Sequence, residues 1–197
     1  VYKRQVFFAH NTAEASAIFF RDIFPGLQVE TVSWGDSETM KATGVLNELR
    51  KNPELSVIDS FAPGMSRKQK IYWRRQALLT DLFLTGSNAL TQKGQLVNLD
   101  MIGNRVGGIT FGPKHVVLFI GINKITANLE EAMHRVRTIA APRNAIRHEG
   151  FRTPCHKTGV CMDCNSPDRI CNVWTITEKS YPAGRIKVIL IGEELGL

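Results

Sequence analysis

The stretch TDLFLTGSNALTQKGQLVNLDMIGNRVGG, residues 80–108, carries most of the information about the fold. Its apolar run at 81–85 is typical of a strand that is buried on both faces of a sheet, and a GSN turn closes that strand. Glycines then punctuate what we interpret as short strands at 95–98 and 106–111. Because ligands of open α/β sheets bind beyond the carboxyl ends of the strands, the GSN turn is a candidate binding segment.

Strands and helices alternate on both sides of this stretch. Further strands are predicted at 5–9, 29–33, 55–59, 115–120, 173–177 and 185–191. Asn128 is expected to cap a helix with an apolar stripe, and Pro142 is expected to end it. The alternation predicts an α/β fold of three layers, with a mainly parallel sheet and helices on both of its faces. We expect one domain over residues 1–197.

The bulk composition suits a single folded domain with a basic surface. The chain has 197 residues, 43% of them hydrophobic, and a formal net charge of +7. Such a charge attracts anionic ligands or acidic partners. The basic residues are dispersed apart from a cluster at 67–75, and no nucleic-acid-reading motif accompanies them, so nucleic acid is not an expected partner. No apolar run is long enough for a membrane span and no signal peptide is evident, so we expect a cytoplasmic protein.

All four cysteines fall in a loop at 154–172 with the spacing C-x5-C-x2-C-x6-C. Four thiolates in one loop suit a tetrahedral zinc ion or an iron–sulfur cluster, and the spacing does not separate the two. A reduced loop without metal is the main alternative. A disulfide framework is less expected, because such frameworks belong to small secreted domains that lack a core. The metal hypothesis names four ligands: Cys155, Cys161, Cys164 and Cys171.

Polar residues with glycines follow three of the predicted strands. Glycine lets the backbone approach a ligand, and amides, hydroxyls or a lysine can hold an anion there. Asp100 is the only evident acid–base candidate, and Lys124 can bind an anion or form a Schiff base. The same residues have structural explanations: a capped helix start, a polar network that holds the turns, or an exposed lysine. The sequence does not indicate a type of reaction. The candidate ligand-binding residues are Gly35, Ser37, Gly86, Asn88, Asp100, Asn104 and Lys124.

Taken together, several segments strongly resemble the LUD-domain (lactate-utilisation) family of bacteria and archaea. They are VSWGDSETMKATGVLNEL, GSNALTQKGQLVNLDMIGNR, LEEAMHRVRTIAAPRNAIR, TPCHKTGVCMDCNSPDRICN and GRIKVILIGEELGL. The resemblance implies the fold shared by ribose-5-phosphate isomerase, glucosamine-6-phosphate deaminase and the CoA transferases. It places Gly35 and Ser37 in a first ligand loop, Gly86, Asn88, Asp100 and Asn104 in a second, and Lys124 in a third. The catalytic glutamate of the CoA transferases has no identifiable counterpart in this chain.

The resemblance also implies a function. We expect an accessory subunit of lactate utilisation or oxidation that binds a small anionic metabolite and docks with iron–sulfur or flavin-type oxidase subunits. A stand-alone enzyme acting on a sugar-phosphate or acyl substrate is an alternative, and a metal- or thiol-dependent sensor is another. A homo-oligomer is among the expected states. The cofactor expectation is an iron–sulfur cluster or zinc on the four cysteines.

Overall fold

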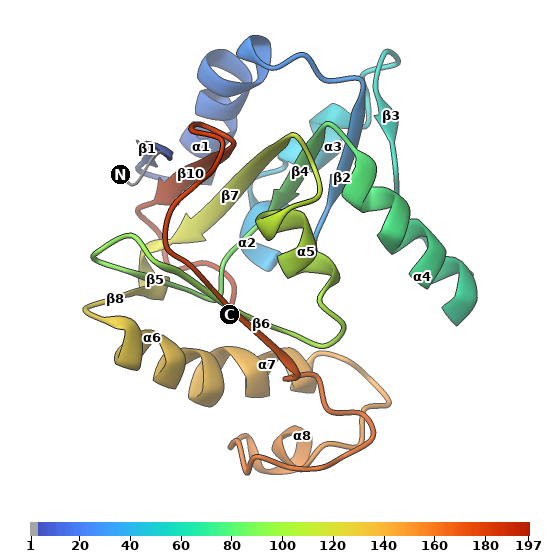
Figure 1. The fold of residues 1–197 in the computed structure, drawn as a ribbon, viewed down its shortest axis with the longest axis vertical. Helices are drawn as coiled ribbons and strands as arrows, with labels where there is room; N and C mark the ends of the chain where they lie inside the picture. The colour runs from blue at the N-terminus through green and yellow to red at the C-terminus, as the bar shows by residue number, and fades with distance from the viewer. Residues whose placement is uncertain (1–3) are drawn as a thin grey trace.

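A six-stranded sheet forms the centre of the computed structural model, which describes residues 4–197 (Figure 1). All five strand pairings in it are parallel, with the order β1-β10-β7-β4-β2-β3. The first three residues of the predicted domain lie outside the described part. The strands are β1 (Gln5–Ala9), β2 (Thr31–Trp34), β3 (Ser56–Val57), β4 (Leu82–Thr85), β7 (His115–Gly121) and β10 (Ile186–Ile191).

Each face of this sheet carries its own apolar core, because successive side chains of a strand point to opposite faces. Val117 and Phe119 of β7 pack with α1 (Thr12–Ile18), α2 (Glu38–Ala42) and α3 (Val45–Leu49) on one face. Val116 and Leu118 pack on the other face with α5 (Asn104–Thr110) and the 3-10 turn Ala77–Leu79. Helices therefore cover both faces of a mainly parallel sheet, as predicted.

A second, smaller sheet lies against the face that α5 covers. Its order is β8-β5-β6-β9, with β5 and β6 antiparallel. Leu90 and Leu96 pack toward the main sheet, while Val97 and Leu99 pack against α6 (Leu129–Arg135), so this sheet is buried on both sides. Its strands are β5 (Ala89–Thr91), β6 (Leu96–Asp100), β8 (Ile125–Thr126) and β9 (Val173–Thr177).

The prediction of a strand at 106–111 is wrong, because residues 106–110 belong to helix α5 and Phe111 is its C-cap. Gly103, with a φ of 82°, precedes the helix in the left-handed region that favours glycine. A Cβ at Gly108 would lie 2.7 Å from the ring of Phe83. The glycine therefore lets the helix approach the sheet closely. In the sequence alone, a glycine needed for such packing cannot be told from one that ends a short strand.

Pro142 does not end the helix that Asn128 caps. The helical path runs from α6 through a π-helical turn at Val136–Ala140 into α7 (Ala141–Ile146), with the proline in the first turn of α7. A proline is tolerated in a first turn because its missing N–H needs no intrahelical partner there. The wider π turn before it accommodates the change of path. The Asn128 cap itself is confirmed, since its side chain accepts from the Glu131 amide at 2.9 Å.

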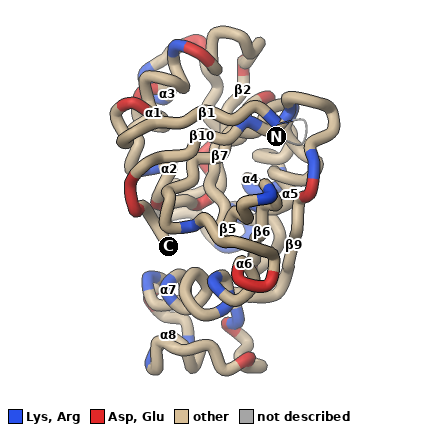
Figure 2. Tube along the Cα trace, turned by 90° about the vertical axis from the view of Figure 1, so that its left-hand side faces the viewer, with Lys and Arg blue, Asp and Glu red and all other residues tan. Residues whose placement is uncertain are grey.

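The basic cluster at 67–75 lies on α4 (Arg67–Gln76), which a Ser66–Gln69 capping box begins. Elsewhere in the view of Figure 2, basic and acidic segments are interspersed. None of the helices within residues 4–197 combines the length and the apolar character needed to cross a bilayer.

Asp81, just before β4, links the starts of three neighbouring strands, β2, β4 and β7. Its Oδ2 accepts from the amides of Glu30 and Thr31 at 3.1 and 3.0 Å and from the Thr31 hydroxyl at 2.8 Å. Its Oδ1 lies 2.7 Å from the Lys114 ammonium. The hydrogen bond with Lys114, followed by those with Thr31 and Glu30, outweighs desolvation and lowers the pKa of Asp81 well below its usual range.

We expect Asp81→Asn to lower the free energy of unfolding at pH 7 by about 1–3 kcal/mol, the scale of charge-assisted hydrogen bonds. Because the pKa of Asp81 is depressed in the folded state, its contribution is present above the unfolded value of about 3.9 and is lost as the pH falls below it. Urea denaturation across pH checks this. Asp22→Asn, which removes only a surface pair with Arg21, is the control, and equal effects of the two variants would contradict the account.

Candidate functional site

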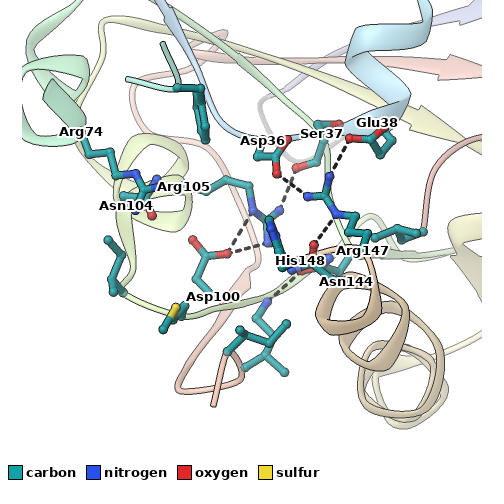
Figure 3. A pocket seen from close by; sticks show the side chains of 18 of the residues that line it. Asp36, Ser37, Glu38, Arg74, Asp100, Asn104, Arg105, Asn144, Arg147 and His148 are labelled. Atoms are coloured by element: carbon teal, nitrogen blue, oxygen red, sulfur yellow. Dashed lines mark hydrogen bonds and ion pairs between the residues drawn. The ribbon is translucent and has the colours of Figure 1, made fainter. Parts of the chain in front are cut away.

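A cleft of about 440 Å³ opens where β2, β4 and β7 end (Figure 3). These strands are parallel neighbours, so the segments that follow them meet at one edge of the sheet. Ser37 follows β2, Gly86 and Asn88 follow β4, and Lys124 lies in the 3-10 turn after β7. The segment that joins β6 to α5 and side chains from α4 and α7 complete the walls.

Six of the seven predicted ligand-binding residues line this cleft, namely Ser37, Gly86, Asn88, Asp100, Asn104 and Lys124. The seventh, Gly35, lies behind the wall. A Cβ at Gly35 would come within 2.8 Å of Cγ of Arg105, so its glycine makes room for that side chain. Ser37 also has a structural role, because its hydroxyl caps α2 by accepting a hydrogen bond from the Met40 amide at 3.2 Å. The role of these seven residues in binding a ligand stays a prediction.

Arg105 organises the wall on the β6 side, although it is not among the residues predicted to form the site. Its guanidinium donates to the Oδ1 atoms of Asn98 and Asn88, both at 2.6 Å, and to the Gly86 carbonyl at 3.0 Å. Nε and Nη2 both donate to Oδ1 of Asp100, at 3.0 and 2.7 Å. One signal in the sequence could have pointed to it: an arginine stands among asparagines and glycines in a stretch of predicted short strands.

Asp100 is the partner of Arg105 rather than a free carboxylate (Figure 3). Its Oδ2 accepts from the Val106 amide at 3.0 Å, so both oxygens are engaged. The side chains of Arg105 and Asp100 are only 11% and 7% exposed. A buried carboxylate in this state orients its neighbours. The hypothesis that it transfers protons stays a prediction, and the geometry gives it no direct support.

The two other acidic side chains of the cleft are also paired. Arg147, the C-cap residue of α7, lies between Asp36 and Glu38, donating to Glu38 at 2.7 Å and bonding Asp36 as well (Figure 3). Lys41 contacts both carboxylates, at 2.7 Å from Asp36 and 3.0 Å from Glu38. Burial opposes ionisation of Asp36, but the bonds and charges of Lys41 and Arg147 outweigh it and lower the pKa of Asp36.

Lys124 is the more deeply buried of the two lysines that line the cleft. The residue is 5% exposed, and its Nζ donates to the Thr39 hydroxyl at 2.8 Å. No ion pair joins it to a carboxylate of residues 4–197. Burial, and then the positive charges of Arg135 and Arg105, lower the pKa of Lys124 to about 7, while Glu38 opposes them.

Two further side chains reach the cleft from helices and were not predicted. The guanidinium of Arg74 lies 5.6 Å from the centre of the Phe61 ring, and its buried Nε has no hydrogen-bond partner. His148 follows α7, and burial together with the charge of Arg147 lowers its pKa, so the imidazole is neutral near pH 7. Both residues lie far in sequence from the strand ends, and only tertiary packing brings them to the site.

The four cysteines do not line this cleft and lie in the loop after α7, which contains the short helix α8 (Pro154–Thr158) (Figure 1). Ile170 of the same loop lines both the cleft and the cavity of the cysteines. All four thiols are free, and together they line one cavity of about 20 Å³. Burial raises the pKa of Cys171, and the charge of Arg169 opposes this. Within residues 4–197, no three His, Cys, Asp or Glu side chains are placed so that they could hold one metal ion.

Comparison with known proteins gives a family and a fold. The family model described as the LUD domain matches residues 3–191. A solved structure of a DUF162 family protein from Deinococcus radiodurans is similar with a TM-score of 0.52 at 14% sequence identity. The similarity covers 96% of this chain and 89% of that one. No curated protein matches the chain.

We expect Lys124→Met to stabilise the protein near neutral pH. Since the pKa of Lys124 is depressed in the folded state, burying the ammonium costs most below pH 7, and the cost disappears as the pH rises toward the unfolded value of about 10.4. The gain over the wild type should be on the order of 1–4 kcal/mol at pH 6 and should shrink toward pH 10.

Thermal unfolding at a series of pH values measures this gain. Lys114→Met is the matched control, because its exposed ammonium pairs with Asp81 and its pKa is raised, so its loss should not stabilise the protein. A gain for Lys124→Met that does not change with pH would show that the ammonium is not under electrostatic strain.

Proposed function

The chain belongs to the LUD-domain family, and we propose that its cleft binds a small anionic metabolite for lactate utilisation or oxidation. In this proposal the protein is an accessory subunit that works with iron–sulfur or flavin-type oxidase subunits. The family supports the metabolic setting, and the residues of the cleft support the anionic ligand. Binding at the carboxyl ends of parallel strands is the usual arrangement in α/β proteins.

One observation carries the proposal: the cleft has basic side chains with no acidic partner. Its three acidic side chains, Asp36, Glu38 and Asp100, are all engaged by arginine or lysine. Lys70, Arg74 and Lys124 also line the cleft, and no ion pair within residues 4–197 uses any of them. A site with uncompensated positive charge and low solvent exposure favours an anion.

The size and lining of the cleft suit a small metabolite. A volume of about 440 Å³ is within the usual range of about 300–1,000 Å³ for small-molecule sites. Phe61, Leu99, Ile102 and Phe151 supply apolar surface, and Asn88, Asn104 and Ser87 supply donors and acceptors. A ligand with one charged end and a hydroxyl or carbonyl group would use both kinds of lining.

We expect isothermal titration calorimetry to detect binding of at least one of pyruvate, L-lactate, ribose 5-phosphate and inorganic phosphate. Arg74→Met should weaken that binding about tenfold, the scale of one lost charge-assisted contact. Arg75→Met is the matched control, since Arg75 lies next to Arg74 on α4 but is exposed and does not line the cleft. No binding across the panel, or equal loss in both variants, would contradict the proposal.

A second proposal concerns the cysteine loop as a metal- or thiol-dependent element. Its support is that four thiols from a segment of 17 residues line one small cavity. Four thiolates suit zinc or an iron–sulfur cluster. Binding would require the sulfur atoms to draw closer together, because no three of them are placed to share an ion as the loop stands.

We expect protein purified anaerobically to contain about one equivalent of zinc or an iron–sulfur cluster, by elemental analysis and visible absorption. Cys161→Ser with Cys164→Ser should abolish the metal and leave ligand binding in the cleft intact, since neither residue lines the cleft. Lys93→Ser with Lys179→Ser serves as the control for a double substitution elsewhere. Metal-free wild-type protein from the anaerobic preparation would rule the proposal out.

A further inference from the structure

We propose that Lys124 forms an imine with a small anionic carbonyl compound bound in the cleft. The substrate class is a carbonyl group carried next to a carboxylate or a phosphate, as in an α-oxo acid or a phosphorylated aldehyde. This inference rests on the proposed binding function and assigns a chemical step to the same site.

The hydrogen bonds around Lys124 leave its nitrogen available as a nucleophile. Nζ donates to Oγ1 of Thr39 at 2.8 Å. The Thr39 hydroxyl in turn donates its own hydrogen to the Leu195 carbonyl at 3.0 Å. Thr39 therefore acts toward the lysine only as an acceptor, and a neutral amine keeps its lone pair uncommitted. An imine-forming lysine needs that lone pair.

The surroundings of Lys124 favour the neutral amine. The residue is 5% exposed, and no carboxylate within residues 4–197 forms an ion pair with it. Arg135 and Arg105 repel its ammonium form, and only Glu38 attracts it. With a pKa of about 7, a substantial fraction of Lys124 is unprotonated at neutral pH, whereas an ordinary lysine is almost wholly protonated. Reactive lysines in proteins are activated in this way, by desolvation and neighbouring cations.

Two other cations, both on α4, select the substrate class. Arg74 and Lys70 line the cleft, and no ion pair within residues 4–197 uses either of them. These groups would bind a carboxylate or phosphate while the amine meets a carbonyl in the same ligand. A hydroxy acid such as lactate would occupy the cleft but has no carbonyl for the amine to attack.

The step balances without an oxidant or a reductant. The lone pair of Nζ attacks the carbonyl carbon, a C–N bond forms, and the carbonyl π electrons move to oxygen. That oxygen takes up the proton lost by nitrogen to give a carbinolamine. Loss of one water molecule, with the C–O bond breaking, leaves the imine. The reaction is reversible, and adding water returns the free lysine.

The test is reductive trapping followed by peptide mapping. The full chain is incubated with pyruvate or with glyceraldehyde 3-phosphate and sodium cyanoborohydride at pH 7.5, and modified lysines are located by mass spectrometry. We expect Lys124 to be modified at least about tenfold faster than Lys70, which lines the same cleft. L-Lactate should slow the reaction by competition. The mapping uses wild-type protein, so it does not depend on a variant that folds.

The outcomes separate this inference from the proposed function. Trapping by pyruvate alone identifies an α-oxo acid site, and trapping by the phosphorylated aldehyde alone identifies a phosphate site. Calorimetric binding with no adduct on Lys124 overturns the imine and leaves the binding function standing. Absence of both binding and trapping overturns the two together. Modification spread evenly over exposed lysines also overturns the imine.

Discussion

The site depends on one buried guanidinium. Arg105 uses all three of its nitrogens to hold the Gly86 carbonyl, two asparagine side chains and Asp100 in one network. It thereby fixes the end of β4, the turn after it, strand β6 and the start of α5 relative to one another. Breaking such a pair leaves a buried charge without compensation, which costs about 3–5 kcal/mol. This wall requires glycine at two positions. Gly35 leaves space for the aliphatic part of the Arg105 side chain, and Gly86 leaves space for Ser37.

The charges of the cleft divide into two kinds. Asp100 with Arg105, and Asp36 and Glu38 with Arg147 and Lys41, are paired and set the shape of the walls. Arg74 and Lys124 are held in place by an aromatic ring and by a hydroxyl instead of a carboxylate. An enclosed cation with no counter-ion is unfavourable in the free protein, and an anionic ligand relieves that penalty. This difference is why we assign binding to the second kind and architecture to the first.

Much of the fold was predictable because its signals are local. Apolar runs predicted the buried strands. Side chains that cap helix starts belong to short sequence motifs, as at Asn11, Ser66 and Asn128. Gly107 and Gly108 misled the prediction, because a glycine needed for close helix–sheet packing resembles one that interrupts a strand. Pro142 misled it too, since a π turn lets the helical path continue past the proline.

The candidate site was predictable where it follows strand ends and unpredictable where tertiary packing builds it. Ser37, Gly86 and Lys124 come directly after strands, so topology alone places them together. Arg74 lies on α4 and Arg147 caps the end of α7, and nothing in their local sequence points to a cleft. The lowered pKa of Lys124 likewise depends on Arg135 and Arg105, which lie 11 and 19 residues away and reach it only in the folded chain.

The most direct test of this account is the titration of Lys124 itself. In protein labelled with 13C and 15N at lysine, the Cε and Nζ resonances of Lys124, assigned with Lys124→Arg, would be followed from pH 5 to 11. We predict a pKa of about 7 in the free protein. A pKa near the ordinary lysine value of about 10.4 would contradict the claim that the cleft is built around an uncompensated amine.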